Sequence, residues 1–410
     1  MSKSKKLSLK LNKYELLYAA VILSFVPVSY LHRIFPMITS VETVVKLAAL
    51  CYVLITTLAL RGRIRKNYFL LVILAFWGYL FVPTYLHCGD LSAYVQTVWN
   101  VPIFILFMVT AFDKRPNQMI NAFCGVFCAY ILINTITTIL FPQGLFETVA
   151  MSGIARKEAS YFLGHKNIVL SYMMPGILCL CYKNYARKNK LTFTTWLYII
   201  GVCVCCVIGQ SLTSMIAVAI VIVSLVMADS KRLSKYINTR TALLMNLLFF
   251  IFIVVLRVQE VFSYFLVSVT GKGLDMNGRT LIWDKALLAI LQHPMIGYGI
   301  EPAKNILSKY MVNSDSFHNL AVDLLYQGGI IGMLLFVAMF YFLDRTIARC
   351  PNIRIKNLCN AVIFATSINW MSQPATRARM LLIYIPVLLT VFMCNNQKQS
   401  ISEYKGKVIQ

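Results

Sequence analysis

The sequence predicts an all-α, polytopic membrane protein with about twelve transmembrane helices and a large outer loop between the ninth and tenth helices. Hydrophobic residues make up 59% of the 410 positions and charged residues only 13%, a balance outside the range of soluble globular chains. The chain also contains many apolar runs near the roughly 20 residues that a bilayer-crossing helix needs. Both observations indicate an integral membrane protein.

The apolar runs define the expected helices in chain order. The first follows a basic start, but it is longer than the apolar core of a removable signal peptide and ends in Tyr30-Leu31-His32, so we expect a retained helix. Only Gly209-Gln210-Ser211 separates the seventh run from the eighth, and the eleventh is short and polar at its end. The twelve runs cover residues 14–31, 39–60, 68–87, 93–112, 117–141, 166–182, 191–208, 210–228, 242–262, 320–343, 357–372 and 378–394.

The positive charge of the chain follows its predicted topology. The formal net charge is +24, and 26 of the 39 lysines and arginines lie in alternate segments, beginning with the N-terminal one. Because cytoplasmic loops are enriched in lysine and arginine, we expect both termini in the cytoplasm, with residues 395–410 as a loose polar tail. Nucleic acid is then an unnecessary partner.

A single membrane domain over residues 1–410 accounts for the pattern, with no separate soluble domain. Two outer segments are long enough to fold over the membrane surface, residues 142–165 and residues 257–319. The second is rich in Arg, His, Asp and Glu, which a simple connector between helices would not need. We therefore expect the active site there.

Residues 257–319 also contain an expected amphipathic helix, which begins near Asn277 or Gly278 and is ended by Pro294. Gly297 and Gly299 allow the tight turn that follows. The predicted apolar face of this helix consists of Leu281, Ile282, Ala286, Leu287, Ile290 and Leu291.

All five histidines fall on or near the predicted outer face, and His318 is the strongest candidate for chemistry. It lies at the start of the tenth expected helix, three residues after Asp315, where a carboxylate could position its imidazole. Near neutral pH such a histidine can accept a proton from a hydroxyl, which is the task of a general base. His32 and His87 fit ordinary histidines at helix ends.

Outer-side cations form a second set of candidates. Arg279 lies in the large outer segment, and Arg377 and Arg379 follow Ser372-Gln373-Pro374 between the last two expected helices. The last two arginines either anchor a loop to lipid phosphates or converge with Arg279 on a diphosphate, which the planar guanidinium binds through two parallel hydrogen bonds. Such cations would stabilise a leaving diphosphate as its charge develops.

Residues 156–167 end the first outer segment and open the sixth expected helix. This stretch contains the candidate substrate-binding residues Arg156, His165 and Lys166. Its density of hydrogen-bonding and aromatic groups fits an edge that faces carbohydrate, and a plain solvated loop fits equally well.

Several catalytic motifs are absent from the sequence, namely Walker A, HExxH, GxSxG and an Asp-rich magnesium motif. We therefore expect no metal and no other cofactor. Mid-helix acids, which proton-coupled transporters often carry, are also scarce. Glu42 and Lys46 form the only expected (i, i+4) ion pair within an apolar run.

Three short motifs follow one another in the chain, namely Gly278-Arg279-x-x-x-Trp283, His293-Pro294-x-x-Gly297-x-Gly299, and His318-Asn319-x-x-x-Asp323-x-x-x-x-Gly328-Gly329-x-x-Gly332. Taken together, they resemble the shared region of bacterial O-antigen ligases and Wzy-type polysaccharide polymerases. The resemblance is sharp over residues 278–332, and the layout of about twelve helices supports it across the chain.

The resemblance implies a metal-independent glycosyltransferase in the cytoplasmic membrane of a bacterium, which moves a glycan from a polyprenyl diphosphate carrier to a hydroxyl on the outer side. It implies that His318 activates the acceptor and that Arg279 engages the diphosphate. One position departs from the family, which often has an arginine just after Gln-Ser or Gln-Thr, whereas Leu212 follows Gln210-Ser211 here. Lys166, Arg156 or Arg377 would have to replace that arginine.

The leading hypothesis is a polymerase that joins polyprenyl-diphosphate-linked oligosaccharide repeats into a surface polysaccharide such as capsule, exopolysaccharide or O-antigen. In this hypothesis Asp315 orients His318, and a chain-length regulator could be a further partner. A ligase that attaches finished glycan to lipid A-core or protein would use the same chemistry with another acceptor. A transporter or flippase for the same carrier is an alternative of a different class.

Overall fold

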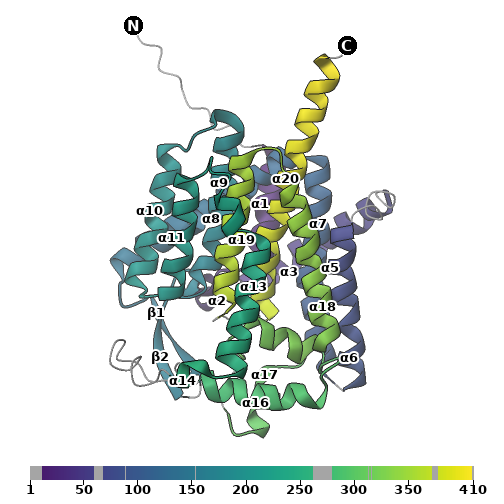
Figure 1. The fold of residues 1–410 in the computed structure, drawn as a ribbon, viewed down its shortest axis with the longest axis vertical. Helices are drawn as coiled ribbons and strands as arrows, with labels where there is room; N and C mark the ends of the chain where they lie inside the picture. The colour runs from purple at the N-terminus through teal and green to yellow at the C-terminus, as the bar shows by residue number, and fades with distance from the viewer. Residues whose placement is uncertain are drawn as a thin grey trace.

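The computed structural model is mostly helical, and its helices pack into one bundle (Figure 1). The described residues are 12–59, 68–87, 89–152, 154–261, 279–312, 314, 316–371 and 377–408. The first helices are α1 (Lys13–Phe25), α2 (Ser29–Ile34), α3 (Ile38–Ala59), α5 (Tyr68–Tyr79), α6 (Phe81–Leu86), α7 (Leu91–Lys114), α8 (Pro116–Leu140), α9 (Val169–Lys188), α10 (Phe193–Ile208) and α11 (Leu212–Val226). They are followed by α12 (Leu233–Tyr236), α13 (Thr239–Phe249), the π-helix η1 (Phe250–Val255), α14 (Val258–Val261), α16 (Arg279–Gln292), α17 (Ala303–Lys309), α18 (Leu320–Ala348), α19 (Ile353–Trp370) and α20 (Arg377–Val408).

The prediction of a polytopic membrane protein is confirmed. Within the described part of the chain, seven helical stretches are long and apolar enough to cross a membrane, and α10 and α11 are shorter apolar helices. The seven stretches are Ile38–Thr56, Tyr68–Leu86, Leu91–Lys114, Pro116–Leu140, Leu233–Val255, Leu320–Ala348 and Met380–Gln397. Every one of the twelve predicted runs is helical over most of its length, because long apolar segments in lipid must satisfy their backbone hydrogen bonds internally.

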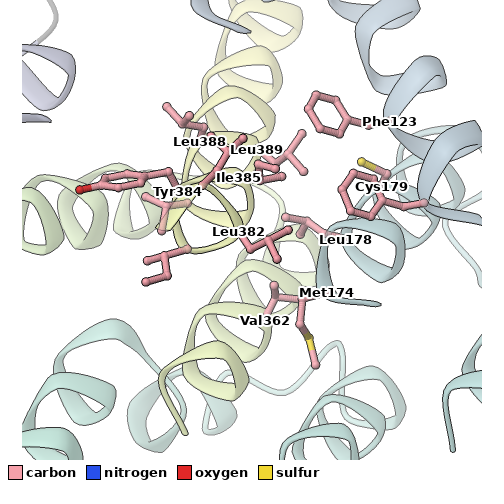
Figure 2. Packing of buried hydrophobic residues seen from close by; sticks show 14 of the residues in the cluster. Phe123, Met174, Leu178, Cys179, Val362, Leu382, Tyr384, Ile385, Leu388 and Leu389 are labelled. Carbon is pink, nitrogen blue, oxygen red and sulfur yellow. The ribbon is translucent and has the colours of Figure 1, made fainter. Parts of the chain in front are cut away.

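The core of the bundle lies where α8, α9, α19 and α20 meet. Leu178 of α9, Val362 of α19 and Ile385 of α20 are fully buried there and point toward one another (Figure 2). Without a hydrophobic driving force between helices in lipid, such close side-chain packing is a main source of helix association. By contrast, α3 exposes Val41, Val44 and Ile55, as a helix on the lipid-facing side of a bundle does.

The two ends of the bundle differ in what they carry. At one end, here called the loop end, lie α14, α16, α17 and a small β-sheet, and α20 terminates at the opposite end, called the tail end (Figure 1). At the tail end, the guanidinium of Arg354 binds the Asp229 carboxylate through Nε at 2.5 Å and Nη2 at 2.7 Å, and also contacts the carbonyl of Asn189. Arg240 Nε lies 2.9 Å from Asp344 Oδ2. These contacts tie the loops that follow α9 and α11 to the start of α19, and α13 to α18.

The sequence analysis predicted an all-α fold, but the structure also contains a small β-sheet. The segment between α8 and α9 forms a three-stranded antiparallel sheet in the order β1 (Phe146–Ser152), β2 (Ile154–Tyr161) and β3 (Gly164–His165). The sheet is anchored below the bundle, because the backbone N–H of Leu163 donates to Asn134 Oδ1 of α8 at 3.0 Å and the Tyr161 hydroxyl donates to the Pro142 carbonyl. A short polar hairpin outside the apolar runs leaves no hydropathy signal, so the sequence did not reveal it.

The loop end is locked to α18 through a break in that helix. Gly329 has φ +59°, and around it the Tyr298 and Gly299 N–H groups donate to the Tyr326 and Gln327 carbonyls, both at 2.7 Å. In return, the Ile330 and Ile331 N–H groups donate to the carbonyls of Pro294 and Met295, at 2.9 and 3.2 Å. Backbone groups freed by the break are thereby paired again. We call this arrangement, between residues 294–299 and 326–331, the backbone interlock.

Three smaller expectations were wrong. The tail was expected to be loose from residue 395, but α20 continues to Val408. On α16 the expected apolar face was wrong in part, because Leu281 and Leu291 are exposed. The buried residues are Ile282, Trp283, Ala286, Ala289 and Ile290, of which Ile282, Ala286 and Ile290 had been predicted. Glu42 does not form the expected contact with Lys46, because its carboxylate lies 2.7 Å from His32 Nε2, and Lys46 Nζ donates to Asn100 at 2.9 Å. Glu42 is thus paired with His32, which lies near the end of α2.

Candidate active site

His318 lies between two firmly held neighbours just before α18. Phe317 is buried, and its carbonyl accepts a hydrogen bond from Trp283 Nε1 at 2.9 Å. Asn319 is also buried and caps α18, since its Oδ1 accepts from the Val322 N–H at 3.1 Å and its Nδ2 donates to the Met371 carbonyl at 3.2 Å. His318 is half-buried, and its backbone is held on both sides by the hydrogen bonds of Phe317 and Asn319.

The backbone of His318 is itself unusual. Its φ is +53°, in the left-handed region that costs a non-glycine residue about 1–2 kcal/mol. Such conformations persist only where the surroundings enforce them, and they cluster at functional sites. Here the hydrogen bonds of Phe317 and Asn319 supply that enforcement, which supports a functional role for the side chain between them.

Arg279 begins the helix that holds this segment. It lies one turn before Trp283 on the same face of α16, about 6 Å along the helix axis. Its Nε is buried and has no hydrogen-bond partner among the described residues. Burial lowers the pKa of the Arg279 guanidinium, and the nearby carboxylate of Glu158 opposes that shift. An arginine whose Nε has no partner among the described residues thus lies one helical turn from the tryptophan that holds the His318 segment.

Glu158 and His165 form a pair on the sheet beside Arg279. Glu158 Oε2 contacts His165 Nε2, and the Asn167 N–H makes a long hydrogen bond of 3.4 Å to His165 Nδ1. Since Nδ1 accepts, Nε2 carries the proton and donates it to Glu158. Both ring nitrogens of His165 are therefore engaged.

The charge on Glu158 is stabilised by its surroundings. Hydrogen bonding from His165 lowers the pKa of the carboxyl group most, and the positive charges of Lys166 and Arg279 lower it further against the opposing effect of burial. The four side chains thus lie within electrostatic reach of one another. The structure brings together Arg279, His165 and Lys166 from the predicted set and adds Glu158, which the sequence analysis left out.

Lys166 also lies beside the turn between α10 and α11. A Cβ built on Gly209 would lie 3.2 Å from Lys166 Cβ, and Ser211 Oγ donates to Asn167 Oδ1 at 2.8 Å. Leu212, which stands where the family often has arginine, is 68% exposed. Of the three cations considered as substitutes, Lys166 is the one whose described contacts lie at this turn.

The remaining predicted residues are only partly covered by the structure. Asp315 lies outside the described residues, so its expected contact with His318 stays a prediction. Arg156 is in β2 opposite Ala150, and Arg377 and Arg379 are in the first turn of α20; the positions of these three side chains are not among those described.

The sequence comparisons can now be set beside this geometry. Residues 197–337 match the O-antigen ligase family. They form an O-antigen ligase family domain. The domain runs from α10 to the broken part of α18, and so it contains Arg279, His318 and the backbone interlock, whereas the sheet with Glu158 and Lys166 precedes it.

A curated relative of this chain bears the name O-antigen ligase and comes from Pseudomonas aeruginosa strain PAO1. It is 40% identical over 73 residues, which cover 18% of this chain and 18% of that protein. The similarity thus spans a small part of either molecule. It supports the family assignment of the O-antigen ligase domain and leaves the activity of the whole protein to be proposed from its site.

Proposed function

We propose that this protein transfers a glycan from a polyprenyl diphosphate carrier to a sugar hydroxyl at the loop end of the bundle. The observation that carries the proposal is the hydrogen bond from Trp283 to the Phe317 carbonyl. Through it, one helix holds both Arg279, a half-buried cation whose Nε has no partner among the described residues, and a strained histidine, His318. A cation for the leaving group and a base for the nucleophile are the two groups that such a transfer needs.

The reaction forms one bond and breaks one bond at the anomeric carbon of the donor sugar. The acceptor hydroxyl oxygen attacks that carbon, and His318 takes the hydroxyl proton. The bond from the carbon to the diphosphate oxygen breaks, and its electron pair leaves with the polyprenyl diphosphate. Arg279 and Lys166 stabilise the charge that develops on this leaving group, and Lys166 takes the place of the arginine that the family often has after Gln-Ser.

Glu158 lowers the net positive charge of this site. With Arg279 and Lys166 both positive, an unoccupied site without a counter-charge would be costly at the edge of a membrane. The carboxylate of Glu158, held by His165, offsets that charge until the diphosphate enters. It leaves a net positive charge for an anionic donor.

We further propose that all twelve helical runs cross the cytoplasmic membrane of a bacterium as a single membrane domain over residues 1–410. Both termini and the tail end would face the cytoplasm, as the distribution of lysine and arginine predicts. The loop end would then face outward, where a lipid-linked oligosaccharide is presented without nucleotide sugars.

Within this chemistry we propose a polymerase that joins lipid-linked repeat units into a surface polysaccharide. A ligase that attaches finished glycan to lipid A-core or protein is the second candidate, and the name of the Pseudomonas relative favours it. The two differ only in the acceptor hydroxyl. Neither the cation nor the base is specific to one of them.

The test is a deletion host that carries either wild-type protein or His318→Ala, with the carrier-linked glycans separated by length. A polymerase lacking its base leaves single repeats on the carrier. A ligase lacking its base leaves long glycans on the carrier and none on the final acceptor. Undiminished long surface chains from a well-expressed His318→Ala protein contradict both.

A further inference from the structure

The chain turns between α13 and the helices of the loop end, and Arg257 is the residue at which it turns (Figure 1). The helix α13 passes into the six-residue π-helix η1, which ends where the Leu256 N–H donates to the Ile251 carbonyl at 2.8 Å. Arg257 follows with φ +55°. π-helical turns are rare and frequently found at functional sites, and a left-handed arginine adds local strain.

The side chain of Arg257 reaches across this turn to the first two turns of α16. Its Nη2 donates to the Thr280 carbonyl at 2.5 Å and contacts the Asp284 carboxylate, across 23 and 27 positions of sequence. Its Nη1 lies 3.4 Å from Glu260. The side chain is only 14% exposed, so these contacts are made by a largely buried guanidinium whose planar fork suits two acceptors at once.

Arg257 contacts the two turns of α16 that carry the cation of the proposed site and the tryptophan that holds the segment of its base. Arg279 immediately precedes Thr280, and Trp283, which binds the Phe317 carbonyl, immediately precedes Asp284. A shift of this helix end would therefore displace Arg279 and disturb the hydrogen bond from Trp283 that holds the His318 segment, which changes the placement of one against the other. Surface ion pairs contribute little to stability, and the carboxylates of Asp284 and Glu260 are 55% and 56% exposed, so stability alone does not explain a buried arginine here.

We infer that Arg257 is a positioning residue, which sets the placement of Arg279 against His318 through the first two turns of α16. The inference rests on the proposed function, since it assigns Arg257 a role in that transfer. Arg257 touches neither substrate nor the reacting atoms; it acts through Thr280 and Asp284. Misplacing reacting groups by about 1 Å can slow a reaction on the order of 100-fold, so a loss of this fork should be measurable in rate.

The experiment measures kcat and KM for a defined polyprenyl-diphosphate oligosaccharide with purified Arg257→Gln, in the wild-type background and again in Arg279→Lys. We expect Arg257→Gln to lower kcat/KM about 10–100-fold in the wild-type background. In the Arg279→Lys background, where the cation is already misplaced, we expect less than about a threefold further loss, because coupled residues are not additive. The matched control is Arg240→Gln, which removes an equal charge from an exposed ion pair at the tail end and should leave both constants unchanged.

A merely structural role gives a different pattern. Equal fold losses in both backgrounds, or wild-type constants for Arg257→Gln, overturn the inference. If Arg257→Gln does not fold, Arg257→Lys keeps the charge without the fork and Asp284→Asn removes one acceptor, and the same non-additivity with Arg279→Lys is expected from each. Absence of any transfer by folded wild-type protein speaks against the proposed function itself, and additive losses in an active protein speak only against Arg257.

Discussion

At the scale of residues, the site depends on charges that are held in place by neighbours. His318 is fixed by the hydrogen bonds of the residues on either side, and Arg279 lies beside a carboxylate that His165 orients. These side chains come from a loop, a helix and a sheet. No single stretch of sequence contains the site.

Lys166 is expected to bind the donor diphosphate in place of the missing arginine. Replacing Lys166 by Gln removes one charge-assisted contact, worth about 1.5–3 kcal/mol, so the KM for the donor should rise at least about tenfold. Lys309→Gln, which removes an exposed cation from α17 at the same end, is the control and should leave KM unchanged. Equal KM values for wild type and Lys166→Gln would remove Lys166 from the site.

His293 is expected to make the protein less stable in acid. Burial and the neighbouring His87, whose ring centroid is 4.0 Å away, lower the pKa of His293. The folded state therefore binds fewer protons than the unfolded chain, so this stability is present above the ordinary histidine pKa of about 6.5 and is lost as pH falls through it. Thermal unfolding in detergent at pH values on either side should show the fall in wild type and a smaller one in His293→Gln. A fall of the same size in the variant counts against this origin.

At the scale of elements, the backbone interlock explains the glycine motifs. Gly297, Gly299 and Gly329 have positive φ, and a Cβ on any of them would lie 2.2–2.6 Å from backbone atoms of another segment. Gly297 and Gly329 thus mark where the two segments of the backbone interlock lie too close for a side chain, and Gly299 marks a close approach to the backbone of Thr84 in α6. Gly332, in the same motif, has no such constraint.

The interlock predicts unequal effects of alanine at two motif glycines. Gly329→Ala places a Cβ 2.4 Å from the Met295 carbonyl in a left-handed conformation, which costs about 1–2 kcal/mol before any clash. It should lower the thermal stability of the purified protein clearly. In Gly332→Ala the nearest atoms to the new Cβ are in Tyr79 at 3.6 Å and Phe76 at 3.8 Å, which is ordinary contact, so this variant should unfold near the wild-type temperature. Equal unfolding temperatures for the two variants would contradict the interlock.

The sequence predicted some elements well because their physical cause is local. Every apolar run became helical, and α16 ends before Pro294 as expected, while the expected start near Asn277 or Gly278 lies outside the described residues. The sheet, the break at Gly329 and the Glu158–His165 pair depend on contacts between distant segments, which hydropathy does not report. The motif pointed to His318, but its enforced left-handed backbone and the bond from Trp283 to Phe317 required the structure.

At the scale of the whole molecule, the bundle separates two polar ends. The tail end holds Arg354 with Asp229 and Arg240 with Asp344, and the loop end holds the proposed site (Figure 1). Such a separation fits a protein that works on one side of the membrane. It also makes the orientation testable with two single residues.

Lys309→Cys in α17 and Lys235→Cys in α12 place thiols on exposed positions at the loop end and the tail end. With the loop end outward, a membrane-impermeant maleimide should label Lys309→Cys in intact cells above the level of the parent protein. It should label Lys235→Cys only after the cells are permeabilised. Labelling of Lys235→Cys in intact cells would reverse the proposed orientation.

The most direct measurement combines purified protein with a defined polyprenyl-diphosphate oligosaccharide, separates the products on a gel, and compares wild type with folded His318→Ala. A general base contributes about 10²–10⁴-fold to rate. Wild type should therefore give a ladder of repeats while His318→Ala leaves the single repeat unextended. A ladder of the same length and rate from His318→Ala would contradict the assignment of His318 as the base of this site.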